Sequence, residues 1–352
     1  MPETIRLRAE VPADVEQAAA LLRAGRLVAF ATETVYGLGA DALSAEAVAR
    51  IFAAKQRPAW DPVIVHVAAY EEIERVAVLD AALGERVEQL ARAFWPGPLT
   101  LLLPRNAGVP DAVTAGRPLV GVRVPSHPSA LALLRAAGVP VAAPSANLFG
   151  HTSPTTAAHV LADLDGRIDA VLDAGPAPVG VESTVVDATQ TPMVLYRPGA
   201  ISAEQIEAAC GVAVEVFVAP AVVREPEALP SPGVGMRHYA PRARVALVEG
   251  EAEDLGRAVD ELRSVGRVGV LLPEGWSLGN LGEEETVVQT WGAWDRPAEL
   301  AARLYAGLRA LDELDVKWIV CPLPAAGPMR DAIRDRLMKA ARSEEQILDI
   351  RF

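Results

Sequence analysis

The chain has 352 residues, of which 51% are hydrophobic and 22% charged, and its formal net charge is −13. This length predicts two to three domains with ample apolar cores, and the acidic balance excludes non-specific coating of nucleic acid or membranes. Two distant cysteines give neither a zinc motif nor a disulfide framework, and no apolar run approaches the about 18 residues of a membrane span, so we expect a cytosolic protein with no membrane partner.

The first elements alternate between strand and helix. Residues 4–8 predict a short strand, 14–23 a helix and 27–30 a buried strand. Small polar side chains follow at 32–34, at the carboxyl end of that strand, where open α/β sheets keep their ligands.

A helix and a pair of cations come next. Gly37 and Gly39 predict a tight turn, and Ser44 predicts the cap of a helix that ends near Lys55, because Arg57 precedes a proline and is pushed into an extended conformation. Lys55 and Arg57 are then two apart on extended backbone and project to the same side. Such a pair suits a polyphosphate, or it merely offsets the negative end of the helix.

The next predicted strand, 62–67, delivers His66 to its far end, where a histidine is either a ligand or a satisfied core residue. A helix is expected over 82–94 and a strand over 99–103. Arg123 then lies inside an otherwise apolar strand. A lone charge there costs several kcal/mol unless it is paired, so Arg123 forms an ion pair or grips an anionic ligand.

After a helix over 129–137, a strand over 139–143 runs into Ser145 and Asn147. Residues two apart on extended chain point the same way, so both can reach a phosphate or its metal, although turn chemistry alone also explains them. Ser153 precedes a proline and predicts the start of a helix through residue 164, with free N–H groups for an anion or as a plain cap.

Strands are expected over 168–173 and 184–187, Arg197 stands at a Pro-Gly turn, and a capping box predicts a helix over 202–210. Residues 217–242 are rich in proline and read as a linker. The pattern then restarts and predicts a parallel, doubly wound sheet from strands 244–249, 267–272, 286–290 and 316–321 and helices 251–264, 297–312 and 327–342.

Several separated runs carry a resemblance: TETVYGLGADA, KQRP, DPVIVHV and VAAPSAN. Together they closely resemble the threonylcarbamoyl-AMP synthase family of YrdC-like proteins over about residues 5–210, with a looser match through 242. The resemblance implies an α/β protein with a YrdC-like twisted open sheet over 1–212, a proline-rich linker over 213–242 and a smaller Rossmann-like parallel domain over 243–352. It implies condensation of L-threonine, bicarbonate and ATP to threonylcarbamoyl-AMP and pyrophosphate.

The resemblance also implies site residues. Lys55 and Arg57 would be catalytic by offsetting charge on the pyrophosphate, Tyr239 would act as a lid, and Mg²⁺ would be carried by ATP rather than by direct protein ligands. Leu119 stands where the family usually has a hydroxyl, and Met236 where it has a second aromatic. The full ATP set is Lys55, Arg57, Asp61, Leu119, Ser145, Asn147, Ser153, Arg197 and Tyr239, and the threonine set is Thr34, His66, Arg123, the Ala143 backbone and Ser183.

Carbamate formation needs a neutral amine, whose proton His66 or a bound water would take. The product would pass to a downstream tRNA threonylcarbamoyl transferase, so that tRNA is met indirectly. Two alternatives stay open: a non-catalytic RNA-binding module, and a carbamoyltransferase that forms carbamoyl-adenylate.

Overall fold

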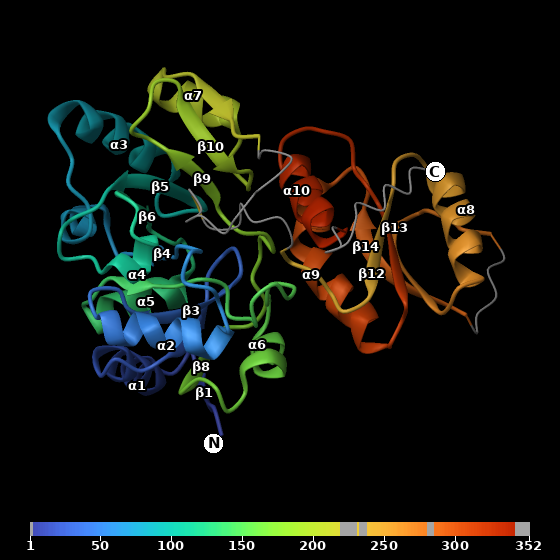
Figure 1. Ribbon diagram of the computed structural model, residues 1–352, viewed down its shortest axis with the longest axis horizontal. Coiled ribbons are helices and arrows are strands. Elements are labelled where there is room, and N and C mark those ends of the chain that lie inside the picture. Colours follow the sequence, from blue (N-terminus) through green and yellow to red (C-terminus); the bar gives the residue numbers. More distant parts are fainter. Residues whose placement is uncertain (1–2, 219–230, 232–237, 280–284, 342–352) are drawn as a thin grey trace. The chain divides into compact units, whose positions relative to one another are not determined.

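The computed structural model describes residues 3–218, 231, 238–279 and 285–341, and its helices and strands confirm an α/β protein (Figure 1). Its contacts divide the chain into two compact units. The first comprises Met1–Phe149, Pro154–Pro178 and Glu182–Gly235, and the second comprises Gly150–Ser153, Val179–Val181 and Met236–Phe352. Most of the expected linker, including Met236, lies outside the described residues.

The first unit is built on a mixed sheet whose described strands run in the order β1-β8-β2-β3-β7-β4-β6-β5-β9-β10-β11. The strands are β1 (Ile5–Arg8), β2 (Val28–Ala31), β3 (Tyr36–Asp41), β4 (Ile64–His66), β5 (Leu99–Pro104), β6 (Leu119–Arg123), β7 (Val141–Ala142), β8 (Ala170–Asp173), β9 (Thr184–Asp187), β10 (Met193–Arg197) and β11 (Val214–Val216). The helices are α1 (Pro12–Arg23), α2 (Ala45–Lys55), the 3₁₀ helix η1 (Tyr70–Arg75), α3 (Ala81–Phe94), α4 (Asp111–Thr114), α5 (Pro128–Ala137), α6 (Ala157–Leu164) and α7 (Ala203–Cys210).

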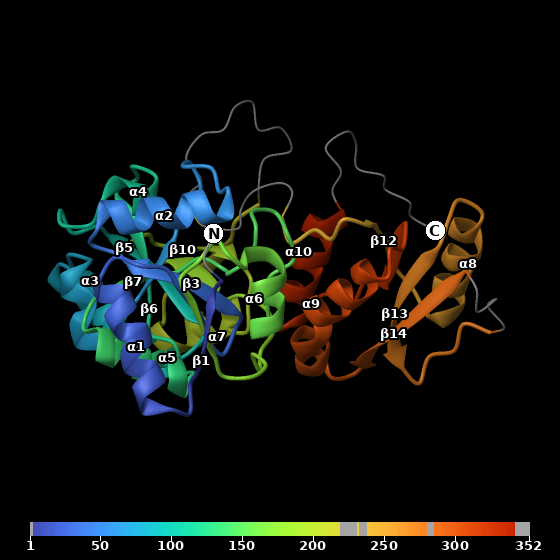
Figure 2. The same cartoon turned by 90° about the horizontal axis from the view of Figure 1, so that it is seen from below.

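Helices cover both faces of this sheet, so its central strands are apolar on both sides. In β2, Val28 and Phe30 belong to the core under α1 and α5, whereas Ala29 and Ala31 belong to the core under α2 and α3. Figure 2 shows α1 and α5 side by side. A strand buried on both faces reads as a continuous apolar run rather than an alternating one, which is the pattern of the sequence here.

The expected turn at Gly37 and Gly39 is wrong. Both glycines lie within β3, which pairs antiparallel with β2, and the chain reverses before them. A Cβ atom on Gly39 would stand 2.9 Å from side-chain atoms of Phe30 and Val141. Glycine is therefore needed here for close packing inside the sheet.

The expected helix start at Ser153 is also wrong. Helix α6 begins at Ala157, and its cap is Thr156, whose side chain accepts a hydrogen bond from the His159 backbone. Ser153 is buried and belongs to the second unit. A proline after a serine allows a helix start, but a later threonine supplies the cap.

The second unit contains a parallel sheet, as predicted, with its described strands in the order β12-β15-β13-β14. Helix α8 packs on one face, and α9 and α10 lie on the other (Figure 1). The elements are β12 (Arg244–Val248), α8 (Ala252–Arg263), β13 (Val268–Glu274), β14 (Thr286–Ala293), α9 (Pro297–Glu313), β15 (Trp318–Pro322) and α10 (Arg330–Ala341). Among the described helices, none combines the length and apolarity needed to cross a membrane.

Candidate active site

Lys55 is the last residue of α2, which Ser44 caps as predicted, and Gln56 in the left-handed conformation ends the helix. Lys55 is therefore not on extended backbone, and the geometry expected for it beside Arg57 is wrong. Its Nζ atom donates to the carbonyls of Ser145 and Asn147, both at 2.6 Å. Burial and the charge of Arg57 hold the pKa of Lys55 well below its usual range, and no described carboxylate forms an ion pair with it.

Arg57 forms a buried ion pair with Asp61, at 2.9 Å between Nη2 and Oδ2. Its guanidinium also donates to the carbonyls of Asp61 and Pro62 and lies 6.0 Å from the centre of the Phe149 ring. Burial raises the pKa of Asp61, and its Oδ1 atom accepts no hydrogen bond from the described residues. The pair thus leaves one carboxylate oxygen available to a ligand.

The loop after β7 brings Ser145 and Asn147 to Lys55. A backbone bridge between Gly37 and Ser145 ties this loop to β3, and Asn147 donates from its amide to the Leu148 carbonyl. The groups of Ser145 and Asn147 that contact Lys55 are their backbone carbonyls. Their side chains remain predicted phosphate ligands.

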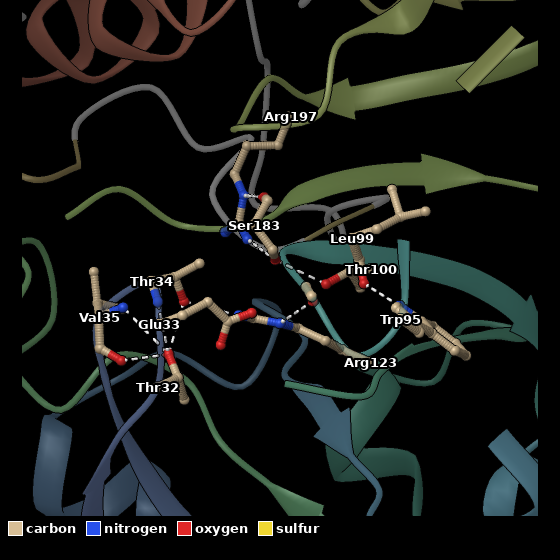
Figure 3. A network of polar contacts seen from close by, with 11 residues as sticks. Thr32, Glu33, Thr34, Val35, Trp95, Leu99, Thr100, Arg123, Ser183 and Arg197 are labelled. Carbon is tan, nitrogen blue, oxygen red and sulfur yellow. Dashed lines mark hydrogen bonds and ion pairs between the residues drawn. The ribbon is translucent and has the colours of Figure 1, made fainter. Parts of the chain in front are cut away.

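Arg123 ends β6 and is buried at the centre of a polar network (Figure 3). Its Nε atom donates to the Gly97 carbonyl at 3.2 Å and its Nη1 atom to Thr34 Oγ1 at 3.0 Å. Its Nη2 atom lies 2.7 Å from Glu33 Oε1. Of the two roles that the sequence left open, the structure contains the ion pair, and the ligand role remains a prediction.

Thr32 fixes the turn that carries Glu33 and Thr34 (Figure 3). Its hydroxyl oxygen lies 2.8 Å from Thr34 Oγ1 and donates to the Val35 carbonyl at 2.7 Å. All three residues were expected at a strand end that keeps ligands, but only Thr34 was among the expected site residues. The signal was present, because a carboxylate between two threonines at a strand end is a polar cluster in an apolar stretch.

Ser183 joins β5 to Arg197, which ends β10. The Ser183 hydroxyl lies 2.8 Å from that of Thr100, and Arg197 donates to the Ser183 carbonyl at 3.0 Å and to its hydroxyl at 3.1 Å (Figure 3). Arg197 is buried and forms no ion pair with a carboxylate in the described ranges. Its charge nevertheless acts on Asp61, so it connects the surroundings of Arg57 with the network around Ser183.

His66 ends β4 and pairs in register with Arg123 on one side and Val141 on the other. Burial, together with the charge of Arg123, lowers the pKa of His66 to about 3, so the imidazole is neutral. Its Nδ1 atom has no hydrogen-bond partner among the described residues. The Ala143 backbone is close by, since its N–H donates to the carbonyl of Ile64 in β4.

Three predicted residues lie apart from these contacts. Leu119 stands at the amino end of β6, opposite the end that carries Arg123, and lines a small cavity with Pro62. Ser153 and Tyr239 belong to the second unit, whereas the other predicted site residues belong to the first. The Tyr239 ring is buried against Tyr305 and the guanidinium of Arg336.

Four buried cations of the first unit take part in these contacts, together with the buried carboxylates Glu33 and Asp61. Asp61 pairs with Arg57 and Glu33 with Arg123. Lys55 and Arg197 are left with neutral oxygen partners among the described residues. Since a buried cation without a counter-charge is costly, this arrangement suits an anionic ligand.

The chain is similar to known proteins in sequence and in fold. Residues 20–199 match the family model Sua5/YciO/YrdC, described as telomere recombination, and residues 201–342 match the model of the threonylcarbamoyl-AMP synthase C-terminal domain. The threonylcarbamoyl-AMP synthase of Pyrococcus abyssi is 42% identical, with 92% of this chain and 93% of the relative covered, and that of Bacillus subtilis is 45% identical, with 93% and 92% covered.

A solved structure gives the same result. The crystal structure of Pyrococcus abyssi Sua5 in complex with L-threonine is similar with a TM-score of 0.85 at 38% identity, covering 96% of this chain and 97% of the other.

Proposed function

Because the chain belongs to the threonylcarbamoyl-AMP synthases in the two-domain Sua5 form, we propose that it condenses L-threonine, bicarbonate and ATP to L-threonylcarbamoyl-AMP and pyrophosphate. The product would serve threonylcarbamoyladenosine modification of tRNA. The observation that carries this proposal is the pair of buried cations, Lys55 and Arg197, without a carboxylate partner in the described part of the chain.

The buried cations support a triphosphate ligand. The compact ammonium of Lys55 and the planar guanidinium groups of Arg57 and Arg197 suit phosphate oxygens in complementary ways. Binding of an anion would offset the burial that depresses the pKa of Lys55 and so favour its charged form. We also assign Asp61, Leu119, Ser145 and Asn147 to the nucleotide site, because they occupy positions that the family resemblance assigns to ATP binding.

Threonine binding rests on the network around Arg123. Pyrococcus abyssi Sua5 binds L-threonine, and the corresponding groups proposed here are Thr34, His66, Arg123 and Ser183, with the Ala143 backbone. The network contains one buried cation for a carboxylate and several neutral groups for a hydroxyl. It therefore offers the chemistry that an amino acid with a hydroxyl side chain requires.

The reaction needs no protein nucleophile. A carbamate oxygen attacks the α-phosphorus of ATP, so the protein must align the two reactants and stabilise charge on the leaving pyrophosphate. We assign the latter role to Lys55 and Arg57. Ser153 and Tyr239 complete the set that the family resemblance implies, with Tyr239 as the expected lid.

The residues present fit a magnesium ion that arrives with ATP. No described group of three or more His, Cys, Asp or Glu side chains could hold a metal by itself. Asp61 Oδ1 is a buried carboxylate oxygen without a hydrogen-bond partner among the described residues and could hold such an ion or its water. Bound Mg²⁺ would neutralise phosphate charge, while Lys55, Arg57 and Arg197 would orient the phosphates.

We place this activity in the cytoplasm, upstream of a tRNA threonylcarbamoyl transferase, with tRNA met indirectly. The test is pyrophosphate formation by the purified chain. It should require L-threonine, bicarbonate and ATP together, and omission of any one should reduce it to background.

Two outcomes would point elsewhere. Salt-dependent RNA binding without ATP turnover would favour a non-catalytic RNA-binding module. Turnover with carbamoyl phosphate in place of threonine and bicarbonate would favour a carbamoyltransferase.

A further inference from the structure

Buried polar atoms with unused hydrogen-bonding capacity gather around Arg123. Both carboxylate oxygens of Glu33, the Nη2 atom of Arg123 and the Nδ1 atom of His66 are inaccessible to solvent and have no hydrogen-bond partner of good geometry among the described residues. Glu33 and Arg123 are in ionic contact at 2.7 Å, yet this contact is not aligned as a hydrogen bond. A buried polar group without a hydrogen bond destabilises the fold, so several together indicate a ligand.

Arg123 and Glu33 are held in place by contacts that would remain when a ligand binds. The Nε and Nη1 atoms of Arg123 are occupied by the Gly97 carbonyl and the Thr34 hydroxyl, so Nη2, which lies 2.7 Å from Glu33, is the guanidinium nitrogen that a ligand can share with that carboxylate. Glu33 stands in the turn that Thr32 fixes (Figure 3). The site therefore presents one fixed cationic donor and one fixed anionic acceptor next to each other.

An amino acid zwitterion has the complementary pair of charges. Its carboxylate accepts hydrogen bonds and suits Arg123 Nη2, and its α-ammonium donates them and suits the Glu33 oxygens. The neutral Nδ1 atom of His66 can serve a hydroxyl side chain. The proposed threonine set includes a partner for the carboxylate but no acidic partner for the ammonium group, and Glu33 supplies one.

We propose that Glu33 binds the α-ammonium group of the amino acid substrate and accepts its proton, so that the amine can form the carbamate. This inference rests on the proposed function and deepens it. Glu33 takes this role in place of His66, because its carboxylate is negatively charged and attracts the ammonium group, whereas burial keeps the imidazole neutral.

The pairing with Arg123 couples the basicity of Glu33 to substrate binding. Burial by itself would raise the pKa of Glu33, and the charge of the adjacent Arg123 holds it below the ordinary value. His66 and His127 also face this carboxylate, and burial lowers the pKa of both, which keeps them neutral at pH 7. When a substrate carboxylate shares the charge of Arg123, that charge lowers the pKa of Glu33 less. Burial then raises this pKa, and Glu33 becomes a stronger base.

The step balances without a further reactant. The ammonium N–H bond breaks and its proton moves to a Glu33 oxygen, leaving a neutral amine and a carboxylic acid. The amine lone pair then attacks the carbon of bicarbonate. As the new N–C bond forms, the hydroxide of bicarbonate leaves together with one amine proton as water. The product is the carbamate that is then adenylated.

A binding experiment on the unmodified chain tests the first half. L-threonine and an analogue with a hydroxyl in place of the α-ammonium group are titrated into the protein by calorimetry, without ATP. We expect threonine to bind roughly tenfold or more tightly than the analogue, since a hydrogen bond to a charged group carries that order of difference. Equal affinity would overturn the proposal, even if every Glu33 variant failed to fold.

The variant Glu33→Gln keeps the shape and removes the charge. Its preference for threonine over the analogue should largely vanish. At neutral pH its single-turnover rate should fall by ~10²-fold or more. The rate should then rise about tenfold per pH unit, because only solution deprotonation would supply the neutral amine, whereas the parent profile should be shallower.

Conservative and control variants separate proton transfer from a structural role. Glu33→Asp should recover the shallow pH profile, and Asp111→Asn, which removes an exposed carboxylate paired with Arg105, should leave both readouts unchanged. A Glu33→Gln profile parallel to that of the parent, or a retained preference for the ammonium group, would overturn the proposal. Failure of the parent chain to bind threonine or release pyrophosphate would overturn the proposed function itself, and the role of Glu33 with it.

Discussion

Lys55 is a buried cation whose partners are two backbone carbonyls rather than a carboxylate. Replacing it with alanine should reduce threonine-dependent pyrophosphate release by ~10²-fold or more, as expected for loss of one preorganised charge, and Arg57→Ala should act similarly. Arg50→Ala is the matched control, because Arg50 lies on the same helix with its side chain in solvent, paired with Glu46. Unchanged turnover in Lys55→Ala and Arg57→Ala would remove the role assigned to these residues.

His66 predicts how stability depends on pH. Its folded-state pKa is about 3, against an ordinary value of 6.5, so the unfolded chain binds the extra proton first. Stability associated with this residue is therefore fully present above about pH 6.5 and is lost as the pH falls toward 3, by up to about 1.4 kcal/mol per pH unit.

Chemical denaturation of the parent and of His66→Gln measures this effect. The difference in unfolding free energy between the two should shift against the parent as the pH falls from 6.5 to 4.5. A difference that does not change over this range would show that His66 is protonated in the folded chain. The exposed His151→Gln variant serves as the control for general acid effects.

At the scale of elements, two glycines with different surroundings make a matched pair. Gly39 lies in β3, where a Cβ atom would stand 3.1 Å from the Val28 carbonyl and 2.9 Å from two side chains, so Gly39→Ala should destabilise the chain by about 1–3 kcal/mol. Gly84 lies in α3 with nothing within 4 Å of an added Cβ atom, so Gly84→Ala should stabilise it by up to about 1 kcal/mol. Thermal unfolding of both variants checks this, and a Gly39→Ala variant as stable as the parent would contradict the packing argument.

The elements also show where local sequence rules hold. Helix α2 begins at its serine cap and α7 at its capping box, as predicted, because a cap depends on residues three or four positions apart. The turn expected at Gly37 failed for the opposite reason. Glycine is compatible both with a turn and with close packing of strands. Which of the two occurs depends on the strands that lie next to it in the fold.

At the scale of the whole molecule, each unit has its own buried core, one around the mixed sheet and one around the parallel sheet. A chain that stops at residue 216 should therefore still unfold cooperatively. It should bind ATP about tenfold more weakly, because it lacks the proposed lid Tyr239. Calorimetric titration with ATP checks this, and the full-length Tyr239→Ala variant is the comparison. Undiminished affinity and activity in the truncated chain would show that the segment after residue 216 is dispensable.

The sequence by itself determined the class of the fold, most helices and strands, the parallel second sheet and the family, because periodicity, caps and short motifs are written in neighbouring residues. It also identified Lys55, Arg57 and Arg123 as candidates, because charged residues stand out in apolar surroundings, whereas Ser183 was a candidate only through the family resemblance.

Only the tertiary structure decided how those residues are used. Glu33 meets Arg123, and Lys55 meets the carbonyls after β7, across long stretches of chain. Whether a buried charge is neutralised by the protein or left for a ligand depends on which distant group the fold places within about 3 Å of it, and spacing along the sequence carries no record of that distance.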